Sequence, residues 1–336
     1  MGYPGLRKQG RSRMLTAYVL DRRGYLAQAD TSPEAPLPGE AVWLDLVAPS
    51  AEEEQRVEAV LGVDVPTREE MQEIEASSRL YEENAALYMT ATVLAKSETD
   101  YPQAGAVTFI LAGDRLVTVR YSEPQPFAAF VTKSQRSPGA YQRGDVILAG
   151  LLDAIIDRLA DILERVGIEV DDISRTVFQQ AAGPVRSFQD VLRQLGRKGD
   201  LTSKARESLF GIERLLLFFS QRCGREEKGG DLRARVETMI RDVRSLADHS
   251  TFLSGKVTFL LDATLGMINI EQNAIIKIFS VVAVVFLPPT LIASIYGMNF
   301  DIMPELHWWF GYPLAICLML GSALAPFLYF KRRGWL

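Results

Sequence analysis

The sequence predicts an α+β domain that continues into one long helix and ends in two transmembrane helices. Its first third alternates short β-type runs with helix-start signals, and the rest carries apolar residues at helical spacing. Two stretches near the end, 278–296 and 308–330, contain no charged residue although 24% of the chain is charged. Each could cross a hydrocarbon core of about 30 Å, which needs about 20 helical residues.

The first 140 residues contain four runs that predict strands. MLTAYVL (14–20), AVWLDLV (41–47) and LYMTATVLA (87–95) are rich in β-branched and aromatic residues. The fourth, AVTFILAGDRLVTVRYS (106–122), predicts a hairpin, because Gly113 and Asp114 interrupt two such runs.

Helix signals stand between and after these runs. In SAEEEQRVEAVLG, Ser50 is placed to cap a helix with an acidic first turn, and Gly62 is placed to end it. TREEMQEI repeats the same logic from Thr67, and PQPFAAFVTKSQ (124–135) predicts a further helix before the Pro/Gly-containing linker RSPGAYQRGD.

Three long helices follow, over about 145–180, 184–223 and 231–296. The last has no proline before Pro288, so read literally it extends roughly 100 Å, too long for a globular core. We therefore expect a stalk that joins the membrane without a linker. The predicted organisation is an α/β domain (1–140), a helical hairpin (141–230), a stalk (231–277), a first span (278–296), an outer loop (297–307), a second span (308–330) and a basic tail (331–336).

Charge at the chain's end sets the predicted topology. Lys331, Arg332 and Arg333 directly follow the second span, whereas the loop at 297–307 has no lysine or arginine. By the positive-inside rule both termini face the cytoplasm and the loop faces out. A bacterial-type inner membrane fits this arrangement. The alternative is that both apolar stretches are buried core helices.

Composition excludes several functions. A net charge of −5 argues against nucleic-acid binding, and no CxxC or HxxxH spacing suggests a zinc cage. No phosphate loop and no nucleophile–base arrangement is present, so neither an enzyme nor an organic cofactor is predicted.

Two helices cannot enclose a water-filled path, so transport would require an oligomer. Steps of three and four residues from Asn273 define a pore stripe of small or mildly polar character: Asn273, Ile276, Ser280, Ala283, Leu287, Thr290 and Ser294. Other faces of this span carry bulkier residues such as Phe279, Val285 and Ile292. Ordinary helix packing would also favour small residues, and this interpretation stays open.

The absence of charge within the spans narrows the cargo. Without a carboxylate in the membrane, no naked ion has a direct ligand and no proton relay exists. A neutral amide suits a cation that keeps its water, and Mg²⁺ dehydrates reluctantly. Asn299, repeated around an axis, would offer carbonyl oxygens to those waters. Asp301 and Glu305 would attract cations just outside.

These residues coincide with a family signature. YGMNF, MPEL, GYP and FKRRGWL stand in the order and spacing of the CorA-type magnesium/cobalt transporters, which the chain resembles. The likeness extends over FLPPTLIASIYGMNF and, more loosely, over VWLDLVAP and LVTVRYSEPQPF. It implies a funnel-shaped homopentamer with five stalk helices and a pore lined by the first span, which carries Mg²⁺ and also Co²⁺ or Ni²⁺.

The resemblance also implies roles for single residues. Asn299 falls on the outer selectivity ring, on a turn shaped by Gly297 and Met298. Thr290, Asn273 and Asp262 fall on polar pore positions. The family's narrow apolar stretch falls on Ile276, Phe279, Ala283 and Leu287, where Leu287 replaces a methionine of other members.

In this family Mg²⁺ bound between cytoplasmic domains closes the pore, which makes it a regulatory ligand as well as the substrate. Candidate acids are Glu169, Asp171, Asp172, Asp242 and Asp248, although each could be part of a solvated helix face. Lys331, Arg332 and Arg333 resemble a basic ring at the inner pore mouth. Two alternatives remain: a zinc transporter of the ZntB branch, and a cytoplasmic sensor that the hairpin merely anchors. The expected partners are further copies of the chain, membrane lipid and divalent cations.

Overall fold

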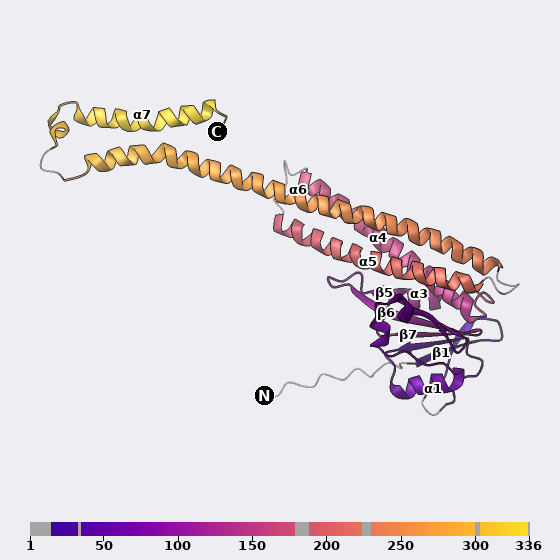
Figure 1. The fold of residues 1–336 in the computed structure, drawn as a ribbon. Coiled ribbons are helices and arrows are strands. Elements are labelled where there is room, and N and C mark those ends of the chain that lie inside the picture. Colours follow the sequence, from indigo (N-terminus) through magenta and orange to yellow (C-terminus); the bar gives the residue numbers. More distant parts are fainter. Residues whose placement is uncertain (1–14, 33–34, 179–187, 224–229, 300–302, 335–336) are drawn as a thin grey trace, which may run out of the picture. The chain divides into compact units, whose positions relative to one another are not determined.

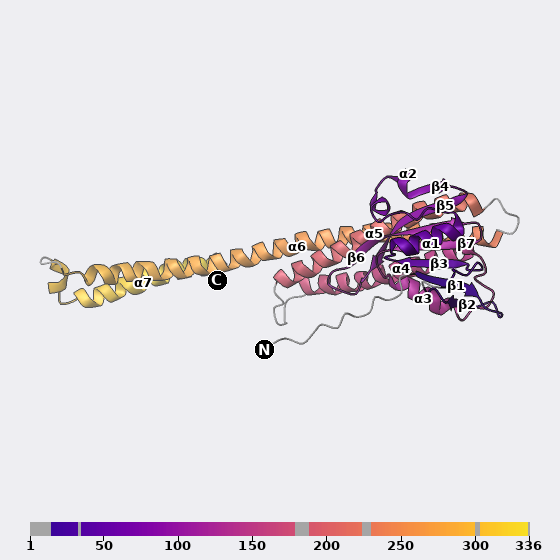
Figure 2. The ribbon, with the colours of Figure 1, turned by 90° about the horizontal axis from the view of Figure 1, so that it is seen from below.

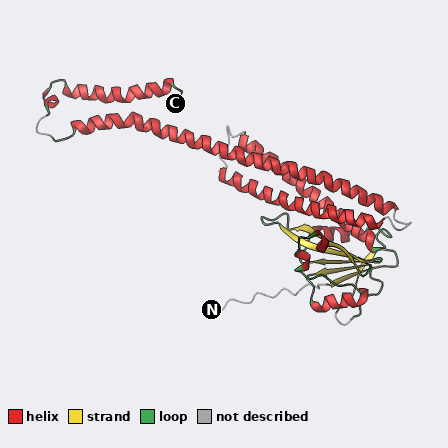
Figure 3. Ribbon diagram, viewed as in Figure 1, coloured by secondary structure: helices red, strands yellow, loops and turns green. Residues whose placement is uncertain are grey.

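The structure is a computed structural model that describes residues 15–32, 35–178, 188–223, 230–299 and 303–334. The chain divides into two compact units, Met1–Leu260 and Leu261–Leu336. The first holds all the strands that the structure describes, and the second is helical (Figure 3). The two units are described separately.

A seven-stranded mixed sheet forms the base of the first unit. Its strands are β1 (Leu15–Leu20), β2 (Leu26–Ala29), β3 (Trp43–Val47), β4 (Leu80–Glu83), β5 (Ala86–Ala95), β6 (Gln103–Ala112) and β7 (Arg115–Arg120), in the order β2-β1-β3-β7-β6-β5-β4. β3 and β7 pair in parallel, and the other neighbours pair antiparallel. The predicted hairpin at Gly113 and Asp114 is confirmed as the β6–β7 turn.

Helices cover both faces of this sheet (Figures 1 and 2). On one face Val57 of α1 (Ala51–Leu61) packs in a cluster with Leu44 and Val117. On the other, Phe127 and Phe130 of α3 (Gln125–Ser134) pack against Trp43. Successive residues of a strand point to opposite faces of the sheet, so Leu44 of β3 packs under α1 and its neighbour Trp43 packs under α3.

Local signals formed α1 as predicted. Ser50 and Glu53 make a capping box, and Gly62 ends the helix in the left-handed conformation with φ of 65°. The prediction for TREEMQEI is wrong beyond its first turn. Thr67 does cap the segment, but only a 3₁₀ turn η1 (Glu70–Gln72) forms, followed by the short α2 (Ala76–Arg79). So short an acidic segment has too few intrahelical bonds to offset the cost of helix nucleation.

Three long helices complete the first unit. α4 (Gly144–Phe178) and α5 (Phe188–Cys223) pack together above the sheet. The third, α6 (Gly230–Tyr296), is joined to them over its first part by the ion pairs Arg235–Asp153 at 2.9 Å and Arg244–Glu213 at 2.6 Å. The prediction of one uninterrupted helix through to 296 is confirmed.

The second unit contains the rest of α6, a 3₁₀ turn η2 (Pro304–His307) and α7 (Gly311–Arg332). Within it α7 runs back alongside the end of α6 (Figures 1 and 2). Both helices are long and apolar enough to span a membrane. Their most apolar 18-residue windows have a mean hydropathy of 2.3 in α6 and 1.8 in α7.

Candidate functional site

Exposure separates the two interpretations of the apolar helices. Only 6% of the most apolar window of either α6 or α7 is buried within the described chain. A core helix of a soluble protein would be mostly buried, so the alternative of two buried core helices is wrong. The exposed apolar surface instead matches a lipid environment or further copies of the chain.

The pore stripe lies on a part of α6 that α7 leaves uncovered. Within the described stretch 278–296, Val281 alone is buried, at 4% exposure, and it marks the side covered by α7. At 100° per residue the stripe is centred roughly 130° around the helix axis from Val281. Its members are exposed in the single chain, namely Asn273, Ile276, Ser280, Ala283, Leu287, Thr290 and Ser294.

The bulkier residues of the first span differ in their burial. Val285 and Ile292 are half-buried on the side of Val281, whereas Phe279 is 71% exposed. The structure therefore assigns two of the predicted packing residues to the hairpin itself. Phe279 has no such cover.

Two prolines follow Leu287 and precede Thr290 in α6. Pro288 and Pro289 lie inside α6, and neither can donate a backbone hydrogen bond to the preceding turn. The hydroxyl of Thr290 donates back to the carbonyl oxygens of Phe286 and Leu287, at 3.1 and 2.8 Å. The oxygen of Thr290 therefore keeps its acceptor capacity on the exposed side of the helix.

The Gly297-Met298-Asn299 turn ends α6. Gly297 N–H donates to the carbonyl of Ala293 at 3.0 Å, and Met298 N–H to that of Ile295 at 3.2 Å, so these two of the last four carbonyls of the helix have partners. Asn299 follows as an exposed residue whose side chain has no hydrogen bond to any residue that the structure describes. Its amide is exposed at the end of the helix.

The outer loop is held close to the start of α7. Glu305 lies in η2, and its carbonyl accepts Trp308 N–H at 3.3 Å. A Cβ on Gly311 would collide with that same carbonyl oxygen, so only glycine permits this approach. Asp301, the other predicted cation-attracting acid, lies outside the described residues.

The opposite end of the hairpin is basic. Lys331, Arg332 and Arg333 end α7 or directly follow it, and all three are exposed. The structure adds Lys277 on α6, whose ammonium donates to the carbonyl of Gly334 at 3.3 Å. Lys277 was not among the predicted site residues, although its place just before the charge-free stretch at 278–296 is a signal that could have identified it.

Three of the five predicted regulatory acids already have cationic partners. Glu169 pairs with Lys198 of α5, and Asp171 pairs with Lys256 of α6. Asp172 pairs with Arg175 at 3.0 Å. The Lys256 ammonium, through its hydrogen bond and its charge, lowers the pKa of Asp171 below the usual range.

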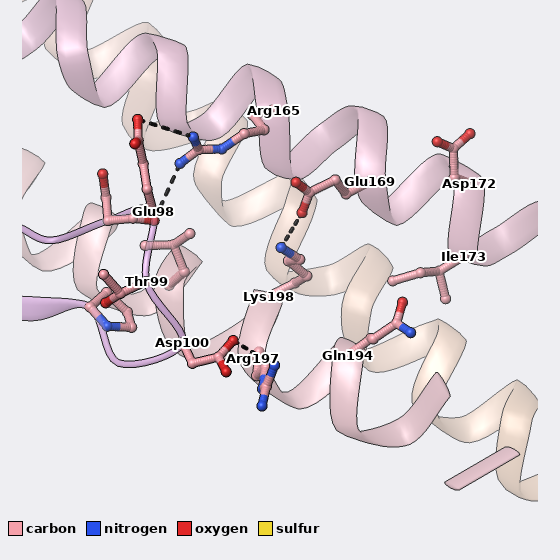
Figure 4. Close-up of a pocket in the computed structure, with 13 residues that line it drawn as sticks. Glu98, Thr99, Asp100, Arg165, Glu169, Asp172, Ile173, Gln194, Arg197 and Lys198 are labelled. Carbon is pink, nitrogen blue, oxygen red and sulfur yellow. Dashed lines mark hydrogen bonds and ion pairs between the residues drawn. The ribbon is translucent and has the colours of Figure 1, made fainter. Parts of the chain in front are cut away.

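These acids do not converge on one point. Glu169 and Asp172 line a cavity of about 870 Å³ between the β5–β6 loop, α4 and α5, in which Glu169 points toward Lys198 (Figure 4). Asp242 and Asp248 are exposed on the first part of α6, and Asp262 is exposed farther along it. Across the described ranges, no group of three or more His, Cys, Asp or Glu side chains could hold a metal ion.

Comparison with known proteins gives one consistent answer. The sequence profile of the family described as "CorA-like Mg2+ transporter protein" matches residues 38–332. The chain is 38% identical over 323 residues to the magnesium transport protein CorA of Pasteurella multocida, which covers 96% of this chain and all of the relative. The CorA magnesium transporter from Methanocaldococcus jannaschii shares its fold, with a TM-score of 0.71 at 19% identity over 97% of this chain and 99% of that one.

The ZntB branch, the predicted alternative, is a more distant match. The cytoplasmic domain of ZntB from Vibrio parahaemolyticus matches with a TM-score of 0.53 at 8% identity, over 76% of this chain and 97% of that one. At that identity the match shows a common fold alone.

Proposed function

The chain belongs to the CorA-like Mg²⁺ transporter family, and we propose that it is a passive channel that carries Mg²⁺ into the cytoplasm. Co²⁺ and Ni²⁺ are further cargoes. The observation that carries the proposal is the uncovered stripe of α6, uncharged from 278 to 296, which leads to the exposed Asn299. The proposal assigns transport to the chain and no chemical reaction.

A single hairpin leaves the stripe facing outward, so the pore requires several copies. We assign these to a funnel-shaped homopentamer in a bacterial inner membrane, with both termini cytoplasmic. Five copies of α6 would turn their stripes to a common axis, and α7 would form the outer layer toward lipid. The basic residues at 331–333 and Lys277 support this orientation by the positive-inside rule.

Selection at the outer mouth would act on the hydrated ion. Mg²⁺ keeps several of its waters, and a ring of Asn299 carbonyl oxygens accepts hydrogen bonds from those waters. Asp301 and Glu305 raise the local cation concentration. A neutral ring holds the ion weakly enough for it to leave, which conduction requires.

Below this ring the ion would pass Thr290, the apolar section at Leu287, Ala283 and Ile276, and then Asn273. Inward movement of a divalent cation gains about 4.6 kcal/mol per 100 mV, twice the single-charge value. The membrane potential is thus sufficient to drive entry without a pump.

Regulation by internal Mg²⁺ belongs to the same proposal. Glu169, Asp171 and Asp172 are paired with cations in the single chain. A divalent ion would have to displace Lys198, Lys256 or Arg175, or bind where acids of neighbouring copies meet. Asp242 and Asp248 are exposed and available for such a contact.

The test is uptake of Mg²⁺, Co²⁺, Ni²⁺ and Zn²⁺ by vesicles that contain the purified full-length protein, at an imposed inside-negative potential. We expect Mg²⁺ entry that grows with the potential, and a mass that corresponds to five copies. Zn²⁺ entry without Mg²⁺ entry would assign the chain to the zinc branch. Absence of entry for all four ions would leave the hairpin as an anchor.

A further inference from the structure

A cavity of about 480 Å³ lies in the α/β domain where β6 extends past the end of β7. The first residue of β6 that pairs with β7 is Val107, opposite Arg120, so the stretch 103–106 is paired with β5 alone. Tyr121 and Ser122 follow β7 and form the facing wall. None of the proposed transport residues lines this space.

Two of its lining residues, Arg68 and Lys204, are cations. Arg68 and Lys204 contribute side chains, and no Asp or Glu is among the lining residues. The Arg68 guanidinium lies 5.3 Å from the centre of the Tyr121 ring, and no carboxylate of the described chain is within ion-pair distance of it. Lys204 donates to Pro102 O at 3.1 Å and to Asp200 at 2.8 Å, which leaves one of its three N–H groups for a further acceptor.

Neutral donors complete the cavity. The Ser122 hydroxyl oxygen is buried without a hydrogen-bond partner in the described structure, a condition that is rare in folded proteins. Arg120 holds the backbone of Ser122 in place, because its guanidinium donates a hydrogen bond to the backbone carbonyl oxygen of Ser122 at 2.8 Å. A Cβ on Gly105 would come to 3.0 Å from the Ser122 oxygen, so the glycine keeps the space open.

Strand β6 and the phenol of Tyr121 add further polar groups to the cavity. The backbone N–H and C=O of one residue point to the same side of a strand. Alternate residues of 103–106 therefore direct their N–H and C=O groups toward the edge of β6 where β7 has ended. Burial, and next the carboxylates of Glu54 and Glu69, raise the pKa of Tyr121. A phenol with the ordinary pKa of about 10 is protonated at neutral pH, so the Tyr121 O–H can donate there with or without this shift.

We propose that this cavity binds a small oxyanion: inorganic phosphate or a phosphomonoester group. An oxyanion would accept from the Arg68 guanidinium, the Lys204 ammonium and the Ser122 hydroxyl at once. Charge-assisted bonds of this kind are the strong ones, and arginine matches phosphate geometry in particular. The volume falls within the range of small-molecule sites, so the phosphate of a larger metabolite also fits.

The experiment is calorimetric titration of the full-length protein in detergent micelles, without Mg²⁺ and with EDTA, using inorganic phosphate in one series and AMP in another. We expect Arg68→Gln and Lys204→Gln each to weaken binding at least about tenfold, the loss expected for one charge-assisted hydrogen bond. Ser122→Ala should weaken it less. Arg22→Gln is the matched control, because Arg22 is an exposed arginine of the β1–β2 turn outside the cavity.

Each outcome decides the matter. Equal affinity for phosphate and AMP supports a site that recognises the oxyanion alone, and tighter AMP binding supports a phosphomonoester ligand. No binding of either at millimolar concentration would overturn the proposal. So would equal affinity in Arg68→Gln, Lys204→Gln and Arg22→Gln. None of these variants alters the proposed ion pathway, so failure here is separable from failure of transport.

Discussion

A buried ion pair between the middle of β3 and the carboxyl end of β7 gives the sharpest stability prediction. Asp45 and Arg120 are only 4% and 8% exposed, and the guanidinium contacts both carboxylate oxygens, at 2.8 and 3.1 Å. Thr118 donates to the same carboxylate at 2.7 Å, and Arg120 lies 4.5 Å from the centre of the Phe127 ring. Arg120→Met keeps much of the volume but leaves the Asp45 carboxylate buried with one donor.

Breaking one side of such a pair destabilises by about 3–5 kcal/mol, because an uncompensated charge stays buried. For a unit of this size the melting temperature should fall by about 6–20 °C. The assay is thermal unfolding of the full-length protein in micelles, followed by circular dichroism. The double variant Asp45→Asn/Arg120→Met should be more stable than Arg120→Met alone, since the carboxylate charge is then absent. A loss below about 1 kcal/mol for Arg120→Met, or a double variant less stable than Arg120→Met, would refute the reasoning.

Two further predictions concern the outer loop and a crowded carboxyl group. Gly311→Ala should reduce Mg²⁺ uptake severalfold, because its Cβ collides with the carbonyl oxygen of Glu305. Gly321→Ala on the same helix is the control, since its Cβ meets nothing within 4 Å and uptake should be unchanged. Equal uptake by the two variants would contradict this reasoning. Burial, then the charge of Asp153, raise the pKa of Asp157. Asp157→Asn should therefore raise the melting temperature at pH 7. The gain should vanish below about pH 4, where the carboxyl group is protonated in both the folded and the unfolded state. A gain independent of pH would contradict a cost that comes from the buried carboxylate charge.

Local chemistry explains what could be predicted of the fold. The helix from Ser50 to Gly62 is specified by its own caps, and the β6–β7 hairpin by two turn residues. The long helix to 296 follows from an apolar period that meets no proline before Pro288. Each of these signals acts over a few residues, so it is readable without the rest of the chain.

Non-local pairing was out of reach. The parallel contact of β3 with β7 joins residues about seventy positions apart, and no local pattern encodes it. The four-residue strands β2 and β4 exist because neighbouring strands offer them an edge. Their own residues gave no separate strand signal, and neither was predicted.

The candidate site divides in the same way. Asn299 and the acids of the outer loop are predicted from motif and topology, and their roles stay predictions. The cations Lys198 and Lys256, which neutralise Glu169 and Asp171, were missed because each lies on a different helix from its partner. Charge pairing between helices depends on packing, which spacing in one segment does not reveal.

The central claim is that the amide of Asn299 holds the hydrated ion at the outer mouth. The measurement that tests it most directly is potential-driven Mg²⁺ entry into vesicles that contain Asn299→Ala, beside Tyr312→Phe, an exposed position on α7 near the same mouth. We expect entry to be abolished in Asn299→Ala and kept in Tyr312→Phe, with the same assembly mass for both. Unchanged Mg²⁺ entry through Asn299→Ala would contradict the claim.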